Sequence, residues 1–201
     1  MIEIATICTG NICRSPLAAL LLQTRLAGRD VRVTSAGTRG MADHPMTPEA
    51  QQLALARGVG AADAAAHRAR FLTEQHLGSA DLVLAMAREH RRAVAELVPA
   101  RTRVAFTARE FARLASSLPD AALLAAAAAA PDQDPAGRLR AAIAAVAGQR
   151  GLVLPPADPA DDDVVDPYRR SWSTYETSAA QLDPAVDQVV RVVELATAPT
   201  A

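Results

Sequence analysis

The chain has 201 residues and a formal net charge of −1, and 50% of its residues are hydrophobic, although only 3% are aromatic and 47 are alanine. The length suits one domain with a sizeable core, and the balanced charge disfavours nucleic-acid binding, which needs a basic surface. We expect no membrane span, because the longest apolar run, an alanine tract near residue 125, is weakly hydrophobic. We expect no signal peptide either, so the two cysteines are predicted to be free thiols in a cytoplasmic protein.

Strands and helices alternate along the first half of the chain. Apolar, β-branched runs predict buried parallel strands, and segments that begin with Ser, Thr or Pro and end near Gly predict helices. The expected strands are residues 2–7, 31–36, 80–86 and 102–106, and the expected helices are 15–28, 47–58 and 87–97, with a short helical turn at 73–76. This order predicts an α/β fold with a parallel sheet and right-handed crossovers.

The alternation stops after the fourth expected strand. Residues 107–155 are rich in alanine, a strong helix former, and are predicted to form a mainly helical insertion in a single domain spanning 1–201. A partly disordered excursion is the alternative. A loop rich in Pro and Asp follows, and then residues 173–195 are predicted to form an amphipathic helix that covers the sheet. The insertion is interpreted as a dimer surface, a substrate-selecting flap or a stabilising cap.

The stretch CTGNICRSP, residues 8–16, follows the first strand and opens a helix. In an open α/β sheet, this edge is where ligands bind. Gly10 permits a backbone angle that other residues avoid. A short loop here turns its N–H groups inward and forms an anion nest, which the helix dipole reinforces. Arg14 can hold two oxygens of a phosphate group at once, so the stretch predicts a phosphate cradle.

Cys8 lies at the base of this cradle, where inward N–H groups, Arg14 and the helix terminus favour its thiolate form. A thiolate so placed can attack phosphorus. Ser15 can donate a hydrogen bond to the sulfur, and Asn11 can lock the loop. A metal clip lacks the further ligands it needs, so we predict a cysteine nucleophile that works with no metal and no cofactor.

CTGNICRSP resembles the signature of the low-molecular-weight protein tyrosine phosphatases, which is a Cys, five residues and Arg-Ser, commonly with Gly-Asn and a second Cys inside. The resemblance covers residues 1–106 and 163–197 and extends to longer, actinobacterial members. It implies a three-layer αβα fold with a four-stranded parallel sheet, phosphotyrosine phosphatase I-like. It also implies hydrolysis of protein phosphotyrosine through a cysteinyl-phosphate intermediate. The phosphate-binding residues that it implies are Thr9, Gly10, Asn11, Ile12, Cys13, Arg14 and Ser15.

The resemblance further implies a general acid in an Asp-Pro pair. This acid would protonate the leaving phenolate and then activate water. The chain has four such pairs, which begin at Asp134, Asp158, Asp166 and Asp183. We predict Asp166, because VVDPYRRS stands just before the last helix, where the family carries its Asp-Pro-Tyr, and Pro167 stiffens the loop. The other three are predicted to be turn, helix-start or helical residues.

Further residues match the family's supporting positions. Ser35 in TSAGT and His67 in HRARFLT match residues that are bonded into the loop network. Cys13 is either a small buried side chain or a redox partner that shelters Cys8 from over-oxidation. Met41 stands where the family often has an aromatic residue against the substrate ring, and Tyr168 is placed on the same substrate rim.

Other functions remain open on the sequence. The same cradle serves arsenate reductases that use an external thiol. It also serves protein-arginine phosphatases, whose corresponding stretch is CTGNTCRS and has a threonine at the position of Ile12 in this chain. A non-catalytic module that binds phosphoproteins is a third alternative. By analogy, the partners are a phosphotyrosine protein and a bacterial tyrosine kinase that governs polysaccharide export. The sequence alone chooses neither the physiological substrate nor the oligomeric state.

Overall fold

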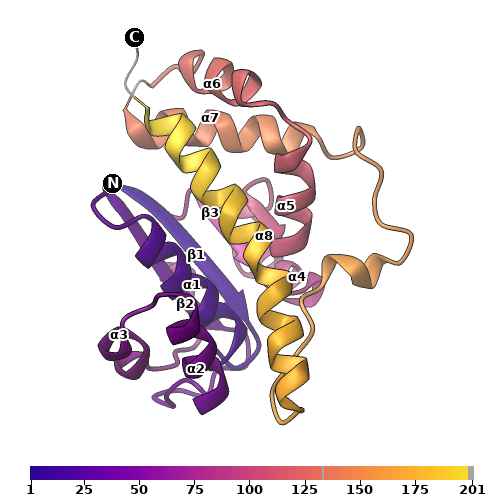
Figure 1. The fold of residues 1–201 in the computed structure, drawn as a ribbon. Coiled ribbons are helices and arrows are strands. Elements are labelled where there is room, and N and C mark those ends of the chain that lie inside the picture. Colours follow the sequence, from indigo (N-terminus) through magenta and orange to yellow (C-terminus); the bar gives the residue numbers. More distant parts are fainter. Residues whose placement is uncertain (133, 199–201) are drawn as a thin grey trace.

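A parallel sheet of four strands forms the centre of the computed structural model, which describes residues 1–132 and 134–198. The strand order is β2-β1-β3-β4, and every neighbouring pair is parallel (Figure 1). The strands are β1 (Ile2–Cys8), β2 (Val31–Gly37), β3 (Leu82–Ala85) and β4 (Ala105–Thr107). The order and the directions confirm the predicted fold class. The fourth strand starts three residues later than predicted, because η2 (Pro99–Arg101) and the turn after it take up the chain before Ala105.

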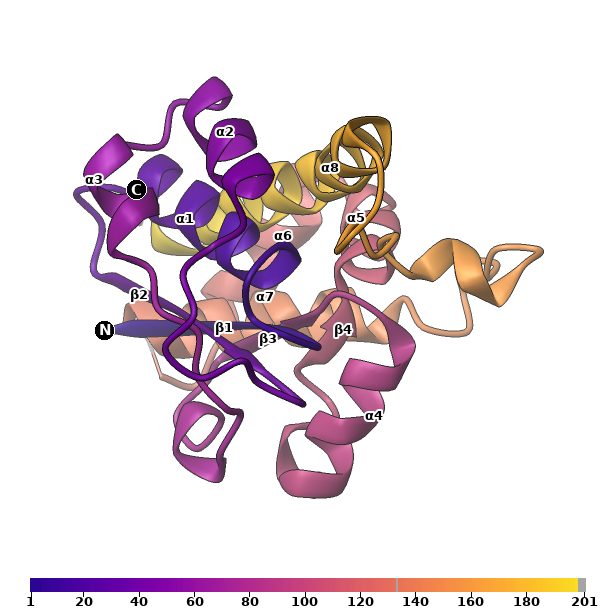
Figure 2. The same ribbon diagram turned by 90° about the horizontal axis from the view of Figure 1, so that it is seen from below.

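Helices cover both faces of the sheet, as Figure 2 shows with α1 and α8 on one side and α4 on the other. The bounds outside the inserted segment are α1 (Arg14–Arg25), α2 (Pro48–Ala56), α3 (Ala61–Ala66), η1 (Glu74–His76), α4 (Arg88–Leu97) and α8 (Trp172–Thr197). Thr47 caps α2 by accepting a hydrogen bond from Ala50 N–H, as its position in the sequence predicts. The sequence prediction missed α3, which has six residues and no side-chain cap. The helix α8 is amphipathic because a buried stripe, including Leu182, Val186 and Val189, faces the core.

Three helices occupy the segment predicted to be helical: α5 (Ala108–Ser116), α6 (Asp120–Ala128) and α7 (Pro135–Gly148). Their buried residues, among them Phe111, Leu123 and Ile143, belong to the main core. Figure 1 shows α6 and α7 at the end of the molecule where the chain begins. There Arg140 of α7 pairs with the buried carboxylate of Asp81, just before β3. Because the strands point away from this end, α6 and α7 favour the interpretation of a stabilising cap over that of a flap at the cradle.

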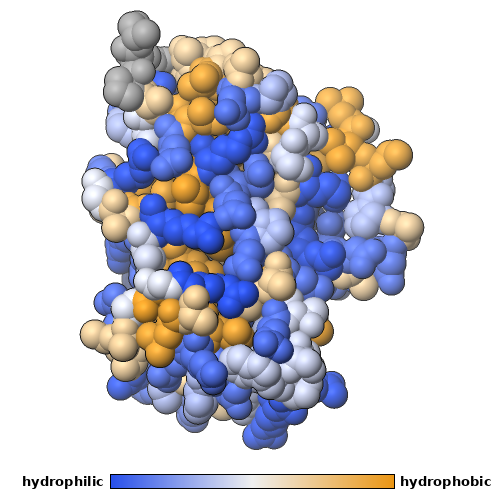
Figure 3. Space-filling model, in the orientation of Figure 1, coloured by the Kyte–Doolittle hydropathy of each residue, from blue (hydrophilic) through white to orange (hydrophobic). Residues whose placement is uncertain are grey.

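After α7 the chain forms a projecting loop, with η3 (Pro159–Asp162), and returns to the sheet (Figure 1). Leu152 and Leu154 in this loop are 76% and 85% exposed, and Figure 3 shows apolar surface on this projection. Within the described ranges, no helix is both long and apolar enough to cross a bilayer.

Candidate active site

The loop from β1 to α1 is held by the side chain of Asn11. Asn11 is fully buried; its Nδ2 donates to Ser15 Oγ at 3.0 Å and to Ser35 Oγ at 2.9 Å, and its Oδ1 accepts from Arg70 N–H at 3.0 Å. Its φ of 56° lies in the left-handed region, whereas Gly10 does not have a positive φ. The prediction that Gly10 supplies the unusual angle was therefore wrong. Asn tolerates this conformation better than most residues, and three hydrogen bonds hold it there.

Two residues brace the cradle from the side: Gly37, which ends β2, and His67, which follows α3. A Cβ at Gly37 would lie 2.6 Å from Thr9 O, so only glycine allows this close approach. His67 Nε2 lies 2.8 Å from Asn11 O, and burial lowers the pKa of His67, with nearby arginines adding to the effect. The ring is therefore neutral and donates its Nε2–H to that carbonyl. The structure thus brings His67 and Ser35 to Asn11, the contacts that the resemblance implies for them.

Cys8 ends β1 at the base of the cradle and is 2% exposed. Its Sγ accepts hydrogen bonds from Ser15 Oγ at 3.0 Å and from Asn11 N–H at 3.2 Å. Two donors aimed at one sulfur are the environment that stabilises a thiolate. Ser15 stands in the first turn of α1, and Cys13, not Ser15, occupies the N-cap position.

Arg14 joins the cradle to the distant Asp-Pro loop. Its guanidinium is 5% exposed; Nη1 donates to Val164 O at 3.1 Å, and Nη2 lies 2.9 Å from Asp166 Oδ2 and 3.4 Å from Thr9 Oγ1. Its buried Nε has no hydrogen-bond partner among the described residues. One face of the arginine is thus held by protein, and Nε remains to bind an anion.

Cys8 opens onto a cavity of ≈ 150 Å³. Its walls combine predicted phosphate-binding residues with the predicted acid and rim residues. They are Cys8, Thr9, Gly10, Ile12, Cys13, Arg14, Arg39, Met41, Asp166 and Tyr168. Asn11 and Ser15 do not line this cavity; they are buried behind it and support the loop. Arg39 is the one wall residue that the sequence prediction missed.

The other three Asp-Pro pairs have structural partners elsewhere. Asp134 caps α7 by accepting from Gly137 N–H, Asp158 caps η3 by accepting from Ala160 N–H, and Asp183 forms an ion pair with Arg57. Of the four, only Asp166 lines the cavity of Cys8. In the part of the chain that the structure describes, no three His, Cys, Asp or Glu side chains gather so that they could hold a metal ion.

Cys13 lies in the cavity wall but differs from Cys8 in its surroundings. Its Sγ lies 3.5 Å from Thr47 Oγ1 and 3.6 Å from Tyr175 OH. Burial raises the pKa of the Cys13 thiol to about 11, so this sulfur stays protonated at neutral pH. Both cysteines are free, and the redox role of Cys13 remains a prediction.

His90 is a site residue that the sequence does not reveal. It lies in the first turn of α4, is 1% exposed, and places Nε2 2.8 Å from Thr9 Oγ1, the hydroxyl that accepts from Arg14. Burial, with Arg14 nearby, lowers the pKa of His90 to about 4. A neutral imidazole thus supports the threonine at the start of the cradle. Nothing in AREHRRAV signals this, because the contact spans 81 residues.

This low pKa makes stability depend on pH. Between the folded value of about 4 and the ordinary value of 6.5, the unfolded chain binds a proton that the folded chain lacks. The contribution of His90 is therefore complete above pH 6.5 and is lost as the pH falls toward 4, with a slope of up to about 1.4 kcal/mol per pH unit. We expect His90→Gln to flatten the free energy of unfolding against pH in this window, measured by urea titration. His44→Gln, at an exposed histidine, serves as control; equal slopes for both variants and the wild type would refute the assignment.

Comparison with known proteins agrees with this geometry. A family model described as low molecular weight phosphotyrosine protein phosphatase matches residues 3–118. Low molecular weight protein-tyrosine-phosphatase Etp of Escherichia coli K12 is 42% identical over 97 residues, which are 48% of this chain and 62% of Etp. A protein-arginine-phosphatase of Bacillus subtilis is 34% identical over 111 residues, which are 54% of this chain and 71% of the relative.

One solved structure shares the fold over the whole length of both chains. The YwlE arginine phosphatase from Geobacillus stearothermophilus superimposes with a TM-score of 0.67, 22% identity, and coverage of 100% of each chain. The sequence match to Etp, by contrast, spans less than two thirds of that relative. The match to the family model ends at residue 118, so Asp166 and α8 lie beyond it.

Proposed function

The chain belongs to the low molecular weight phosphotyrosine protein phosphatase family, and we propose that it hydrolyses protein phosphotyrosine through a cysteinyl-phosphate intermediate. One observation carries the proposal. Cys8 Sγ, which accepts two hydrogen bonds, opens onto the same small cavity as the guanidinium of Arg14 and the carboxylate of Asp166. A nucleophile, an anion-binding group and a candidate proton donor therefore surround one cavity of ≈ 150 Å³.

In the first step, the phosphate would bind to the loop N–H groups and to Arg14, whose Nε has no protein partner. Cys8 Sγ attacks phosphorus while the bond from phosphorus to the phenolic oxygen breaks. Asp166, in its acid form, gives its proton to that oxygen. To do so, its carboxyl group exchanges the contact with Arg14 Nη2 for the leaving oxygen.

In the second step, Asp166 removes a proton from a water molecule, which attacks the phosphocysteine. The sulfur leaves as a thiolate, and inorganic phosphate is released. Ser15 Oγ–H and Asn11 N–H point at Sγ and stabilise the charge that returns to it. The cycle regenerates both Cys8 and Asp166 and consumes one water, so it needs no metal and no cofactor.

The cavity walls favour an aryl ester among the substrates considered. Ile12, Met41 and Tyr168 contribute apolar side chains to the wall, against which a phenyl ring can pack. The relatives named protein-arginine-phosphatases make phosphoarginine the second candidate. The bulk of Ile12 and its lack of a hydroxyl suit an aryl ester better. Arsenate offers no organic leaving group for Asp166 to protonate, and a binding module has no use for the full set of reactive groups.

Turnover of three substrates, measured side by side, tests the proposal. The substrates are a phosphotyrosine peptide, phosphoarginine, and arsenate with a thiol donor, each assayed with and without a chelator. We expect the highest kcat/KM for the phosphotyrosine peptide and no effect of the chelator. Faster release of phosphate from phosphoarginine would assign the chain to that activity, and binding of the peptide without turnover would favour the non-catalytic module.

Partner and location form part of the same proposal. Several relatives are named protein-tyrosine-phosphatases, which supports a phosphoprotein as substrate. A bacterial tyrosine kinase is the partner we propose, and phosphate release from an autophosphorylated kinase would test it. The two free thiols suit a cytoplasmic location, which fractionation of the source cells would check.

We propose further that Cys13 protects Cys8 by forming a reversible disulfide under oxidation. Cys13→Ser is expected to leave kcat and KM near their wild-type values, because Cys13 stays protonated and gives no charge to the phosphate. After peroxide and then a thiol reductant, the variant should recover less activity, since Cys8 then proceeds to irreversible acids. Equal recovery in both proteins would remove this role.

A further inference from the structure

Each of the three residues before Asp166 is held by a different part of the structure. Asp163 binds Arg88 of α4: its carboxylate accepts from the backbone N–H at 2.7 Å and from the guanidinium. It thereby caps α4, whose own N-cap residue, Ala87, has no capping side chain. Val164 is 1% exposed and donates its N–H to the backbone oxygen of Met86, the residue after β3.

The peptide unit between Val164 and Val165 is clamped at both ends. Its carbonyl oxygen, Val164 O, accepts from Arg14 Nη1 at 3.1 Å, and its N–H, on Val165, donates to Gln181 Oε1 of α8 at 2.8 Å. Because a peptide unit is planar, fixing both its oxygen and its N–H fixes the orientation of the whole plane. The plane sets the direction in which the chain enters Val165, the residue that precedes Asp166.

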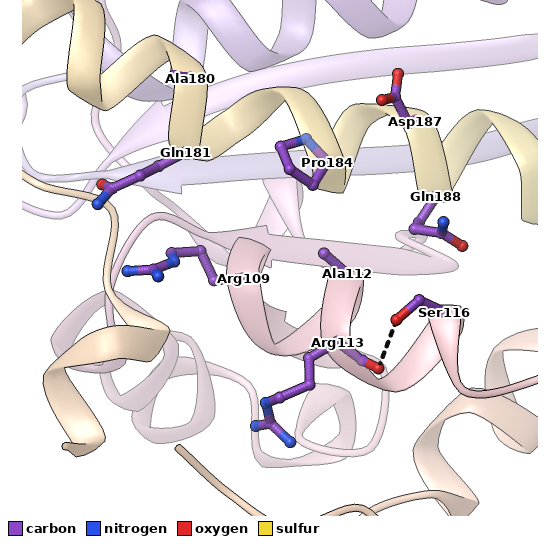
Figure 4. Close-up of a pocket in the computed structure, with 9 residues that line it drawn as sticks. All are labelled: Arg109, Ala112, Arg113, Ser116, Ala180, Gln181, Pro184, Asp187 and Gln188. Carbon is purple, nitrogen blue, oxygen red and sulfur yellow. Dashed lines mark hydrogen bonds between the residues drawn. The ribbon is translucent and has the colours of Figure 1, made fainter. Parts of the chain in front are cut away.

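Gln181 reaches this peptide from the end of a groove between α5 and α8. Figure 4 shows its side chain extending away from α8 above Arg109, with Gln188 on the same helix beyond Pro184. Arg109 of α5 donates to Asp163 O at 3.2 Å, so both walls of the groove contact the loop backbone. The groove has a volume of ≈ 530 Å³ but contains none of the groups that surround Cys8. Two of the side chains that line the groove, Gln181 and Arg109, hold the loop.

We propose that Gln181 is a positioning residue for the general acid, a role that rests on the proposed function. Asp166 is 53% exposed and contacts Arg14, and this contact must be given up when the carboxyl group turns to the leaving oxygen. The hydrogen bond from Val165 N–H to Gln181 does not involve the cradle and persists through that exchange. It keeps the peptide between Val164 and Val165 oriented, one residue before Asp166, and so restricts where the released carboxyl group can lie, which favours the leaving oxygen over solvent.

The test compares leaving groups, because a misplaced acid matters most where the leaving oxygen is basic. Gln181→Met removes the acceptor with little change in length. We expect it to lower kcat/KM, which reports the first step, about 10- to 100-fold for phenyl phosphate and far less for p-nitrophenyl phosphate. Gln181→Glu keeps an oxygen acceptor and should restore most of the rate. Gln181→Ala repeats the test with a second side chain, and thermal unfolding monitors the fold of each variant.

Gln188→Met is the matched control, since Gln188 lines the same groove but its Oε1 accepts from Arg191. It should behave as wild type. Equal losses for both esters in Gln181→Met, or the same losses in Gln188→Met, would overturn the positioning role in favour of a general effect on stability. Wild-type rates for both esters equally overturn it and leave the proposed function intact. If the wild type hydrolyses neither ester, the proposed function fails first, and the inference with it.

Discussion

Cys8→Ser will lower kcat for p-nitrophenyl phosphate by at least about 10⁴-fold, the scale seen when a covalent nucleophile is removed. The sulfur is the atom at which two donors and the cavity converge. A serine hydroxyl is much less acidic than a thiol, and the loop contains no general base to remove its proton. Release of p-nitrophenol, measured with a chelator present, gives the rate, and a pre-steady-state burst should be absent in the variant.

The neighbouring cysteine supplies the matched control for this experiment. Cys13→Ser makes the same chemical change in the same loop and is expected to retain turnover. Binding should survive in Cys8→Ser, because Arg14 and the loop N–H groups are unchanged, so inorganic phosphate should raise the Tm of both variants and of the wild type. Equal turnover by Cys8→Ser and wild type, or loss of wild-type activity to the chelator, would contradict the mechanism.

Local patterns predicted most of the sheet, because the strands are short runs rich in apolar and β-branched residues. In β1, six of seven residues are buried, which is what a central parallel strand requires. The misses have local causes. The six-residue α3 follows Gly60 with no capping side chain and so gives no start signal. The fourth strand is displaced because Pro99 begins a 3₁₀ turn, which Thr102 closes by donating to Pro99 O.

Part of the site can be predicted from residues that are close in the chain, and part depends on residues that are distant in the chain. Cys8, Arg14 and Ser15 are close in the chain, so their geometry follows from one strand-to-helix loop. The sequence predicts the unusual backbone angle at Gly10, but it occurs at Asn11, because Ser35 and other residues that are remote in sequence hold Asn11 there. His90 contacts Thr9 only because β3 lies next to β1 and delivers the start of α4 to the cradle.

Segment 107–155 shows how a low-complexity sequence can still have a defined place. Alanine predicts helix but not packing, so three interpretations of the insertion remained open on the sequence. In the structure, α6 and α7 lie at the amino end of the sheet, whereas α5 reaches the acid loop through Arg109 and, by an ion pair with Asp162, through Arg113. The segment therefore covers one end of the sheet and, at the other end, contacts the loop that carries Asp166.

The proposed role of Asp166 as general acid predicts an effect that depends on the leaving group. Asp166→Ala is expected to lower kcat for phenyl phosphate about 10²- to 10⁴-fold, the usual contribution of a general acid. For p-nitrophenyl phosphate, whose leaving oxygen needs little protonation, the loss in the first step should be much smaller. A series of substituted phenyl phosphates, plotted as log kcat/KM against the pKa of the leaving phenol, measures this difference as a steeper slope in the variant.

The ion pair with Arg14 adds a second expectation for the same variant. Asp166 Oδ2 forms an ion pair with Arg14 Nη2 at 2.9 Å. Removing the carboxylate therefore frees that nitrogen and takes a negative charge out of the cavity. Inorganic phosphate should therefore inhibit Asp166→Ala at lower concentration than it inhibits the wild type, although catalysis is weaker. Asp158→Ala is the control, because Asp158 also precedes a proline in the same loop but caps η3. If Asp158→Ala steepens the slope and Asp166→Ala does not, the acid lies elsewhere; if Asp166→Ala slows every ester equally, its carboxylate shapes the cavity and transfers no proton.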